Sequence, residues 1–405
     1  MGKRELKNWI NSYVEYTECT EPPILFRKWA AISTIASALQ RKCSLSWGTL
    51  TFYPNMYIVL VAPSGKARKG VAMGSAMNML DTININMTAE AITREALIRD
   101  LNMSSKEDID DKTGEMFFHA SLTIHSQELT VFIGYQNNEL LMDLTDWYDC
   151  RKKWTYRTKN MGSDEIIGVW VNLFGATTPE LLQTTLPTDA IGGGLTSRMI
   201  FVYEPKKAKS LVFPFPTDEQ RTIGEQLKKD IGRIEMLKGE FKVSKDFPEA
   251  WARWYLAQED HPPFQDNRFS GYFERRPTHI MKMSMIISAA KSDKMVITVE
   301  DLNDAIEILE QTEEKMPQVF AGVGTASHAN VLASVMARVG MAGQITLRDL
   351  MYEFRYDADR WLMNKIVETL ELSGFCDIIR PGGGDKNMII RYNPDNQHNK
   401  DANLY

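Results

Sequence analysis

Apolar and polar positions along the chain follow two different periods, and the change of period predicts the elements. Five short, almost wholly apolar segments are expected to be buried strands: 56–61, 83–88, 117–126, 167–176 and 197–204. Runs with helical periodicity lie between them, so strands and helices alternate. This order is typical of a mainly parallel sheet covered by helices, and it predicts an α/β fold.

The same pattern predicts how the chain is organised. We expect an N-terminal helical collar, an α/β core, a helical lid, a small C-terminal domain and a polar, disordered tail. Their expected bounds are 1–50, 51–216, 217–322, 323–394 and 395–405.

The small domain has the order helix, short strand, two helices and two strands, and the two strands are joined by RPGGGDK at 380–386. This order predicts a winged helix. Its second helix can enter a DNA major groove, with the glycine turn as the wing.

Composition narrows the class of protein. The chain has 405 residues, of which 43% are hydrophobic and 25% charged, so we expect a globular protein of two or three domains. No apolar stretch approaches the roughly 18 residues that span a bilayer, and MGKRELKNW lacks the apolar segment of a signal peptide. We therefore expect a cytoplasmic location and no membrane partner. The four cysteines are far apart in sequence and are expected to be reduced thiols.

A phosphate-binding loop is the first candidate site. An apolar strand, the turn APSGKARKG and a helical run follow one another from Met56 to Leu80. In this order, backbone N–H groups and a helix N-terminus face an anion while a lysine neutralises it. The alternative is an ordinary strand-to-helix connection with solvated lysines. The candidate nucleotide-binding residues are Pro63, Ser64, Gly65, Lys66, Arg68, Lys69 and Gly70.

This loop departs from the usual G-x-x-x-x-G-K-[ST] pattern. In the frame that ends at Lys69, Pro63 and Arg68 replace the two glycines, and Gly70 replaces the hydroxyl residue that ligates Mg²⁺. Only the lysine conforms. A frame on Gly65 and Lys66 would begin inside the strand, so we favour Lys69.

The strand SLTIHSQEL supplies a candidate acid. Glu128 follows the apolar strand, where a carboxylate can polarise the attacking water and contact the metal. Gln127 stands where a Mg²⁺-binding aspartate is expected, and Ser126 is the only neighbouring hydroxyl. The alternative is that Glu128 caps the helix that follows.

Two further polar positions complete the expected catalytic set. Asn172, with Thr177 and Thr178, is expected at the carboxyl edge of the next strand, where it would orient water or sense the terminal phosphate. A structural role is the alternative for all three. Arg198 follows a glycine run and precedes the last strand; it is expected to act on the nucleotide of a neighbouring subunit, or else to form a local salt bridge.

This order of motifs resembles the AAA+ ATPases. It is more closely similar to phage and mobile-element replication proteins of the helicase and primase-helicase kind, through APSGKARKG, SQE, GATTPELL and GGLTSR. The resemblance covers roughly residues 20–320. It implies a P-loop ATPase that uses ATP and Mg²⁺, forms a ring of six subunits, and acts on DNA with other replication proteins. The alternative is a weakly hydrolysing initiator or helicase loader that binds DNA through its winged helix.

The resemblance also assigns two further groups of residues. Arg275 and Arg276, just before Pro277, would present a second arginine to the nucleotide from the start of a lid helix, or would pair with Glu274 or the acids of EDLND. A basic segment would form a hairpin around 160–165 that points into the ring channel and holds single-stranded DNA. The alternative is an exposed basic strand edge. Its candidate DNA-binding residues are Lys152, Lys153, Trp154, Tyr156, Arg157 and Lys159.

Overall fold

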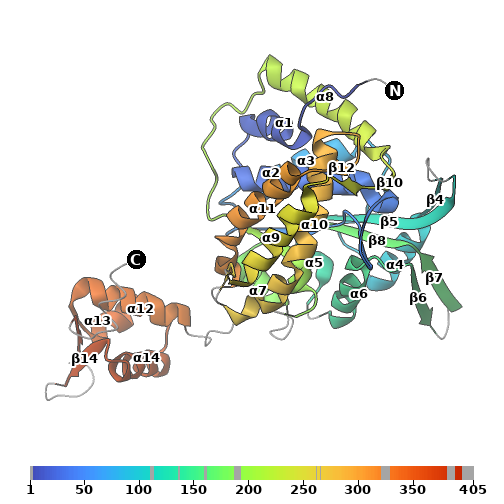
Figure 1. Ribbon diagram of the computed structural model, residues 1–405. Helices are drawn as coiled ribbons and strands as arrows, with labels where there is room; N and C mark the ends of the chain where they lie inside the picture. Colours follow the sequence, from blue (N-terminus) through green and yellow to red (C-terminus); the bar gives the residue numbers. More distant parts are fainter. Residues whose placement is uncertain are drawn as a thin grey trace. The chain divides into compact units, whose positions relative to one another are not determined.

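The chain forms two compact units, 1–320 and 321–405, which are described separately (Figure 1). The computed structural model describes residues 3–109, 114–135, 137–158, 162–186, 193–260, 262–264, 266–320, 329–380 and 388–394. The regions expected as a collar and a lid both belong to the first unit. The expected tail, 395–405, lies outside the described residues.

A five-stranded sheet in the order β4-β5-β8-β3-β9 forms the centre of the first unit. Its four parallel strands are β3 (Tyr57–Val61), β5 (Met116–Ser126), β8 (Val169–Thr177) and β9 (Met199–Tyr203). Every residue of β3 and β8 is buried, as expected for parallel strands covered on both faces. The predicted α/β fold with a mainly parallel sheet is confirmed.

Two segments beside β5 differ from simple strands. The strand predicted at 83–88 is wrong: it is reduced to one isolated bridge between Met87 and Thr123. The Asn86 side chain donates to the carbonyls of Ser104 and Ser121 instead, so a side chain competes with the ladder. The segment that follows α4 provides β4 (Ser105–Ile109), which pairs antiparallel with β5.

Helices cover both faces of this sheet. Asn172 of β8 donates to Ser33 and Ser37 of α2 (Ile24–Leu39), so α2 lies on the face to which Asn172 points. Leu173, the next residue, points to the other face together with its neighbour Tyr57, whose hydroxyl donates to Leu144 of α6 (Asn138–Tyr148). α3 (Lys69–Leu80) packs beside α2. α2 is buried along almost its whole length, so it is a core helix and not part of a collar.

The remaining helices of the first unit complete its helical layers. α8 (Asp218–Glu235) and α11 (Val299–Glu313) each begin with a capping box, formed by Thr217 with Gln220 and by Thr298 with Asp301. α10 is the longest and is buried from His279 to Ala290. The other helices of the first unit are α1 (Trp9–Tyr16), α4 (Arg94–Met103), α5 (Leu129–Ile133), α7 (Pro179–Thr185), α8 (Asp218–Glu235), α9 (Phe247–Asp260), α10 (Ser270–Lys291) and α11 (Val299–Glu313), with 3-10 turns η1 (Thr17–Cys19), η2 (Gln40–Lys42), η4 (Thr196–Arg198), η5 (Asn267–Phe269) and η6 (Met316–Phe320).

Short strands outside the central sheet pair with one another in smaller sheets. β1 (Cys43–Trp47) pairs with β2 (Leu50–Phe52) and with β10 (Gly239–Glu240), and β11 (Lys242–Val243) pairs with β12 (Val296–Ile297). β6 (Lys153–Thr158) and β7 (Gly162–Ile167) form an antiparallel hairpin that extends past α4 and α6 at the margin of the first unit (Figure 1).

The second unit is a small helical domain with one antiparallel sheet. It contains α12 (Ala329–Ala342), β13 (Gln344–Thr346), α13 (Leu347–Glu353), α14 (Arg360–Leu372), β14 (Cys376–Ile379) and β15 (Ile389–Tyr392), with the sheet order β13-β15-β14. Val335, Leu350, Met363, Leu370 and Ile390 lie in its core. The predicted order of helices and strands is present. The turn RPGGGDK, apart from Arg380, lies outside the described residues.

No helix in the described ranges combines the length and the apolar character that crossing a membrane requires. All four cysteines are free thiols.

Gly168 gives a test of the turn that leads from the hairpin into β8. It has φ +66°, and a Cβ added there would lie 2.5 Å from the carbonyl oxygen of Phe118. We expect Gly168→Ala to lower the free energy of unfolding by about 3 kcal/mol, from left-handed strain plus overpacking. Gly48 has φ +62° and open space around it, so Gly48→Ala should lose only about 1 kcal/mol. Equal losses in urea unfolding would contradict the packing argument.

Candidate functional site

The loop after β3 lies where the strand order changes direction. The chain goes from β3 to strands on one side and later returns to β9 on the other, and ligands of open α/β sheets bind at such a point. The carboxyl ends of three strands meet here. The amide of Ala62 donates to the carbonyl of Thr177 (3.4 Å), and the amide of Glu204 donates to that of Val61 (3.1 Å).

The backbone of the loop has the form of an anion-binding concavity. Gly65 and Arg68 both adopt left-handed conformations, with φ +69° and +57°. Arg68 therefore keeps the backbone that glycine would adopt at this position of the usual pattern. In the described part of the chain, the amides of Gly65, Arg68, Lys69 and Gly70 have no intramolecular acceptor. Four such N–H groups at a turn and a helix N-terminus are suited to phosphate oxygens.

Lys69 lies at the first position of α3 and points back into this loop. Its Nζ donates to the carbonyl oxygen of Ala62 at 2.7 Å. Burial lowers the pKa of Lys69, and the carboxylates of Glu128 and Glu180 oppose that shift by favouring the charged form. The strand end of β5 adjoins the same helix turn, since a Cβ on Gly70 would lie 3.5 Å from Oε1 of Gln127. Lys69, Gln127 and Glu128 are thus brought together as the sequence predicted.

Glu128 is exposed and begins α5, but its side chain caps none of the amides of that helix. The alternative role as a capping residue is therefore not what the structure shows. Within the described residues, no three His, Cys, Asp or Glu side chains gather as a metal site. A Mg²⁺ ion here fits only if nucleotide phosphates supply most of its ligands, with Glu128 as a protein ligand.

Glu21 links this loop to the segment at 207–211, which is distant in sequence. Its carboxylate accepts hydrogen bonds from Nε of Arg68 (2.7 Å), Nζ of Lys207 (2.6 Å) and the amide of Leu211 (3.1 Å). These donors lower the pKa of Glu21 to about 2. The amide of Lys207 also donates to the carbonyl of Lys66 at 2.9 Å. The side chain of Arg68 is therefore engaged with Glu21, and only its backbone faces the loop.

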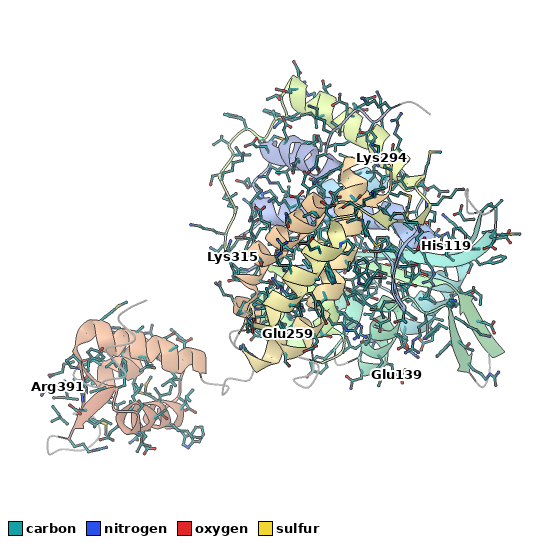
Figure 2. All side chains as sticks on the ribbon, in the orientation of Figure 1. His119, Glu139, Glu259, Lys294, Lys315 and Arg391 are labelled. Carbon is teal, nitrogen blue, oxygen red and sulfur yellow. The ribbon has the colours of Figure 1, made fainter. Side chains whose placement is uncertain are left out.

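The helical region reaches this edge of the sheet through a residue that the sequence argument missed. Nζ of Lys315, between α11 and η6, donates to the buried carboxylate of Glu204 at 2.7 Å. Lys315 lies on the side of the first unit away from His119 (Figure 2). Glu204 comes directly after β9, much as Glu128 comes two residues after β5, so a similar signal was available in the sequence.

The expected position of Asn172 is wrong. It pairs with Thr123 near the middle of β5, and its Oδ1 accepts from the amide of Met56, before the start of β3. It is five residues upstream of Thr177, about 16 Å at strand spacing, and fully buried. Asn172 therefore joins the sheet to α2, and Thr177 is the polar residue at the carboxyl edge. Thr178 caps α7.

Arg198 takes the second of its two expected roles. Its side chain is 8% exposed and donates to Asp149 Oδ2 (2.6 Å) and to the carbonyl of Gly194 (2.7 Å). The local salt bridge is thus what the structure shows. Arg275, expected at the nucleotide, donates to the other oxygen of Asp149 at 3.0 Å.

Around this pair lies a group that we call the Asp149 cluster, in which Arg198, His279 and Lys282 are buried while Asp149 and Arg275 are partly open to solvent: Asp149, Arg198, Arg275, His279 and Lys282. Lys282 Nζ donates to Oδ1 of Asn55 at 2.7 Å, so the cluster lies at the amino ends of the parallel strands, opposite the phosphate-binding loop. Burial lowers the pKa of Lys282 to about 8 and that of His279 to about 3. A lone lysine inside the apolar run HIMKMSMII was the signal for Lys282 in the sequence.

Arg276 is buried and pairs within the helical layer. It makes a bidentate contact with Glu313 of α11, with Nε to Oε1 at 2.8 Å and Nη2 to Oε2 at 2.9 Å. Neither Glu274 nor the acids of EDLND is its partner. Pro277 lies inside α10, which begins at Ser270, so neither arginine stands at a helix N-terminus. The prediction that one of them faces the nucleotide is therefore wrong.

The basic segment forms a hairpin, with a shorter turn than expected. Lys153 pairs with Ile167 and Thr158 with Gly162, so most of the predicted 160–165 turn belongs to β7. Lys159 lies outside the described residues. Lys152, Lys153 and Arg157 are exposed; of these, Lys153 makes an ion pair with Glu165 at 2.6 Å.

The two aromatic residues of the hairpin point the other way. Trp154 packs edge-on against Trp147 of α6, with ring centroids 5.5 Å apart, and stacks on Tyr156. Arg94 of α4 lies over the Tyr156 ring at 5.0 Å. The period of two thus separates cations on the outer face from aromatic anchors on the inner face. The predicted stacking of Trp154 or Tyr156 on a DNA base is not supported by this packing.

Comparison with known proteins gives no further guide: no protein-family model and no curated protein matches the sequence.

The burial of Lys282 predicts that the free energy of unfolding depends on pH. Its pKa is about 8 in the folded chain and 10.5 as a free side chain, so between these values the unfolded chain binds more protons. The free energy of unfolding should therefore rise by about 3 kcal/mol from pH 8 to 10.5, relative to Lys282→Met, which lacks the titrating group. Urea unfolding of both proteins across this range measures the difference. Parallel curves would show that Lys282 is not desolvated.

Proposed function

We propose that the protein is an ATP-dependent DNA motor of the AAA+ kind, a helicase or translocase that acts in phage or mobile-element replication. The observation that carries the proposal is the loop after β3. Its four unpartnered amides, the ammonium of Lys69 and the carboxylate of Glu128 lie together at the point where the strand order changes.

In this proposal the loop residues 63–70 bind the nucleotide phosphates. The amides of Gly65, Arg68, Lys69 and Gly70 donate to the phosphate oxygens, and the ammonium of Lys69 exchanges the carbonyl of Ala62 for a phosphate. Glu128 orients the attacking water, and Thr177 lies at the adjacent strand end. Mg²⁺, held mainly by the phosphates with Glu128, would neutralise charge on the transferring group.

DNA is the proposed substrate of the hairpin and of the second unit. Lys153 and Arg157 present their charges on one exposed face of β6, which is suited to a phosphodiester backbone. The helix and strand order of residues 329–392 supports a winged helix. In it α14, the second of the two adjacent helices α13 and α14, is the helix that reads duplex DNA. A ring of six subunits would bring the hairpins together around a single strand.

A second candidate function rests on what the loop lacks. Gln127 and Gly70 replace the usual Mg²⁺ ligands, and both Arg198 and Arg275 are held by Asp149 within the same chain. These features favour a nucleotide-gated initiator or helicase loader that hydrolyses ATP slowly.

Nucleotide binding is tested at Lys69. We expect Lys69→Ala to weaken the binding of a fluorescent ATP analogue at least tenfold, because the ammonium that faces the phosphates is lost. Lys245→Ala removes an exposed lysine outside the loop and is the matched control. Glu128→Gln should bind the analogue normally and slow hydrolysis on the order of 100-fold.

Hydrolysis with and without single-stranded DNA separates the two candidates. A motor should be stimulated by DNA, whereas a loader should bind ATP with slow, unstimulated turnover. Unchanged nucleotide binding in Lys69→Ala would reject the phosphate-binding loop and both candidates with it.

The hairpin is tested by its salt dependence. Lys153→Ala/Arg157→Ala should weaken binding to (dT)15 and reduce the slope of log affinity against log salt by about 1.4, at about 0.7 per phosphate contact. Lys228→Ala/Lys229→Ala, on α8, removes two charges elsewhere and should leave the slope unchanged. An unaltered slope in the hairpin variant would exclude these residues as phosphate contacts.

A further inference from the structure

The first unit has a polar cavity at the base of the β6–β7 hairpin. It has a volume of about 430 Å³ and lies between η2, the start of β5 and the turn from β7 into β8. Pockets for small ligands occupy roughly 300–1,000 Å³. Since β5 and β8 both begin here, the cavity lies at the opposite edge of the sheet from the phosphate-binding loop. We call it the hairpin-base pocket.

One wall of this pocket is a fixed guanidinium. Arg41 is more than nine-tenths buried, and its Nη1 donates to the carbonyls of Cys150 (2.6 Å) and Val169 (2.9 Å). Its Cζ lies 4.1 Å from the centroid of the Tyr53 ring. Among the described residues, Nε and Nη2 of Arg41 have no acceptor, and neither is enclosed. The arginine is therefore held in one orientation with donors to spare.

The opposite wall is apolar and open to solvent. Phe117 and Phe118, at the start of β5, line the pocket, and Phe118 is 50% exposed. Lys152 stands at the rim without an ion-pair partner in the described part of the chain. Glu240 also lines the pocket, but Lys242 already neutralises it.

An exposed ring, a fixed guanidinium and an ammonium without an ion-pair partner in the described part of the chain line one pocket, and this combination is suited to a planar base with an attached phosphate. The hairpin brings Lys152 to the pocket, and Lys153 follows it on the exposed face of β6. A strand held by that face would therefore end beside Lys152, a lining residue of the pocket.

We propose that the hairpin-base pocket binds one nucleotide unit of the single strand held by the hairpin, with its base against Phe118 and its phosphate at Arg41 and Lys152. This inference rests on the proposed function for its source of ligand. The same chemistry would accept a free nucleoside monophosphate, and the experiment distinguishes the two sources.

The test uses the full chain with two probes, dTMP and (dT)15 carrying a photoreactive 4-thiothymidine. Phe118→Ala removes the half-exposed ring, and Arg41→Lys removes the spare donors. Tyr255→Ala, an exposed aromatic of α9, is the matched control. We expect crosslinks to the peptide containing Phe117 and Phe118, a loss of at least fivefold in crosslinking in Phe118→Ala, and about tenfold weaker (dT)15 binding. Tyr255→Ala should match the unaltered protein.

Other outcomes are equally decisive. Crosslinks confined to other segments, with (dT)15 affinity unchanged in Phe118→Ala, would overturn the inference. If (dT)15 does not bind at all, the proposed DNA function fails by itself. Binding of dTMP that Phe118→Ala abolishes would then identify the pocket as a site for free nucleotide, and absence of dTMP binding would reject the pocket. If Arg41→Lys fails to fold, Phe118→Ala alone decides.

Discussion

The parallel pairing of β3 with β8 and β9 is the constraint on which both ends of the first unit depend. It places Val61 beside Thr177 and Tyr203 at one edge, and Tyr57 beside Met199 at the other. Because all three strands run the same way, the loops that follow them converge at the carboxyl edge. The residues that precede them, among them Asn55 and Arg198, converge at the amino edge. The candidate site and the Asp149 cluster are thus consequences of one register.

Charged groups are arranged differently at the two edges of the sheet. At the carboxyl edge, Lys69 and the loop amides keep donors in reserve for an anion. At the amino edge, Asp149 receives one arginine on each oxygen, and His279 stays neutral between Tyr148 and the carbonyl of Ser197. These pairings hold α10 against the sheet, although Nε of Arg198 is buried without an acceptor among the described residues, whereas the loop with its free amides is suited to binding.

Periodicity predicted the parallel sheet, the loop after β3 and the hairpin, because each depends on local pattern. Asn172, Arg275 and Arg276 were placed wrongly because their positions depend on partners more than a hundred residues away or, for Arg276, on another helix. Asp149, for example, lies 126 residues from Arg275. The strand predicted at 83–88 failed because asparagine side chains compete with the backbone ladder, a choice that apolar alternation does not report.

Glu21 has a consequence beyond holding a loop in place. With a pKa of about 2 it stays ionised in mildly acidic solution, so mild acidity does not release the segment at 207–211 that it anchors. Its bond to Arg68, however, is open to competition from any denser negative charge that enters the turn. The carboxylate of Glu21 would then lose one of its three donors when a ligand binds. The first segment to rearrange would be the connection between β9 and α8, which Glu21 holds through Lys207 and Leu211.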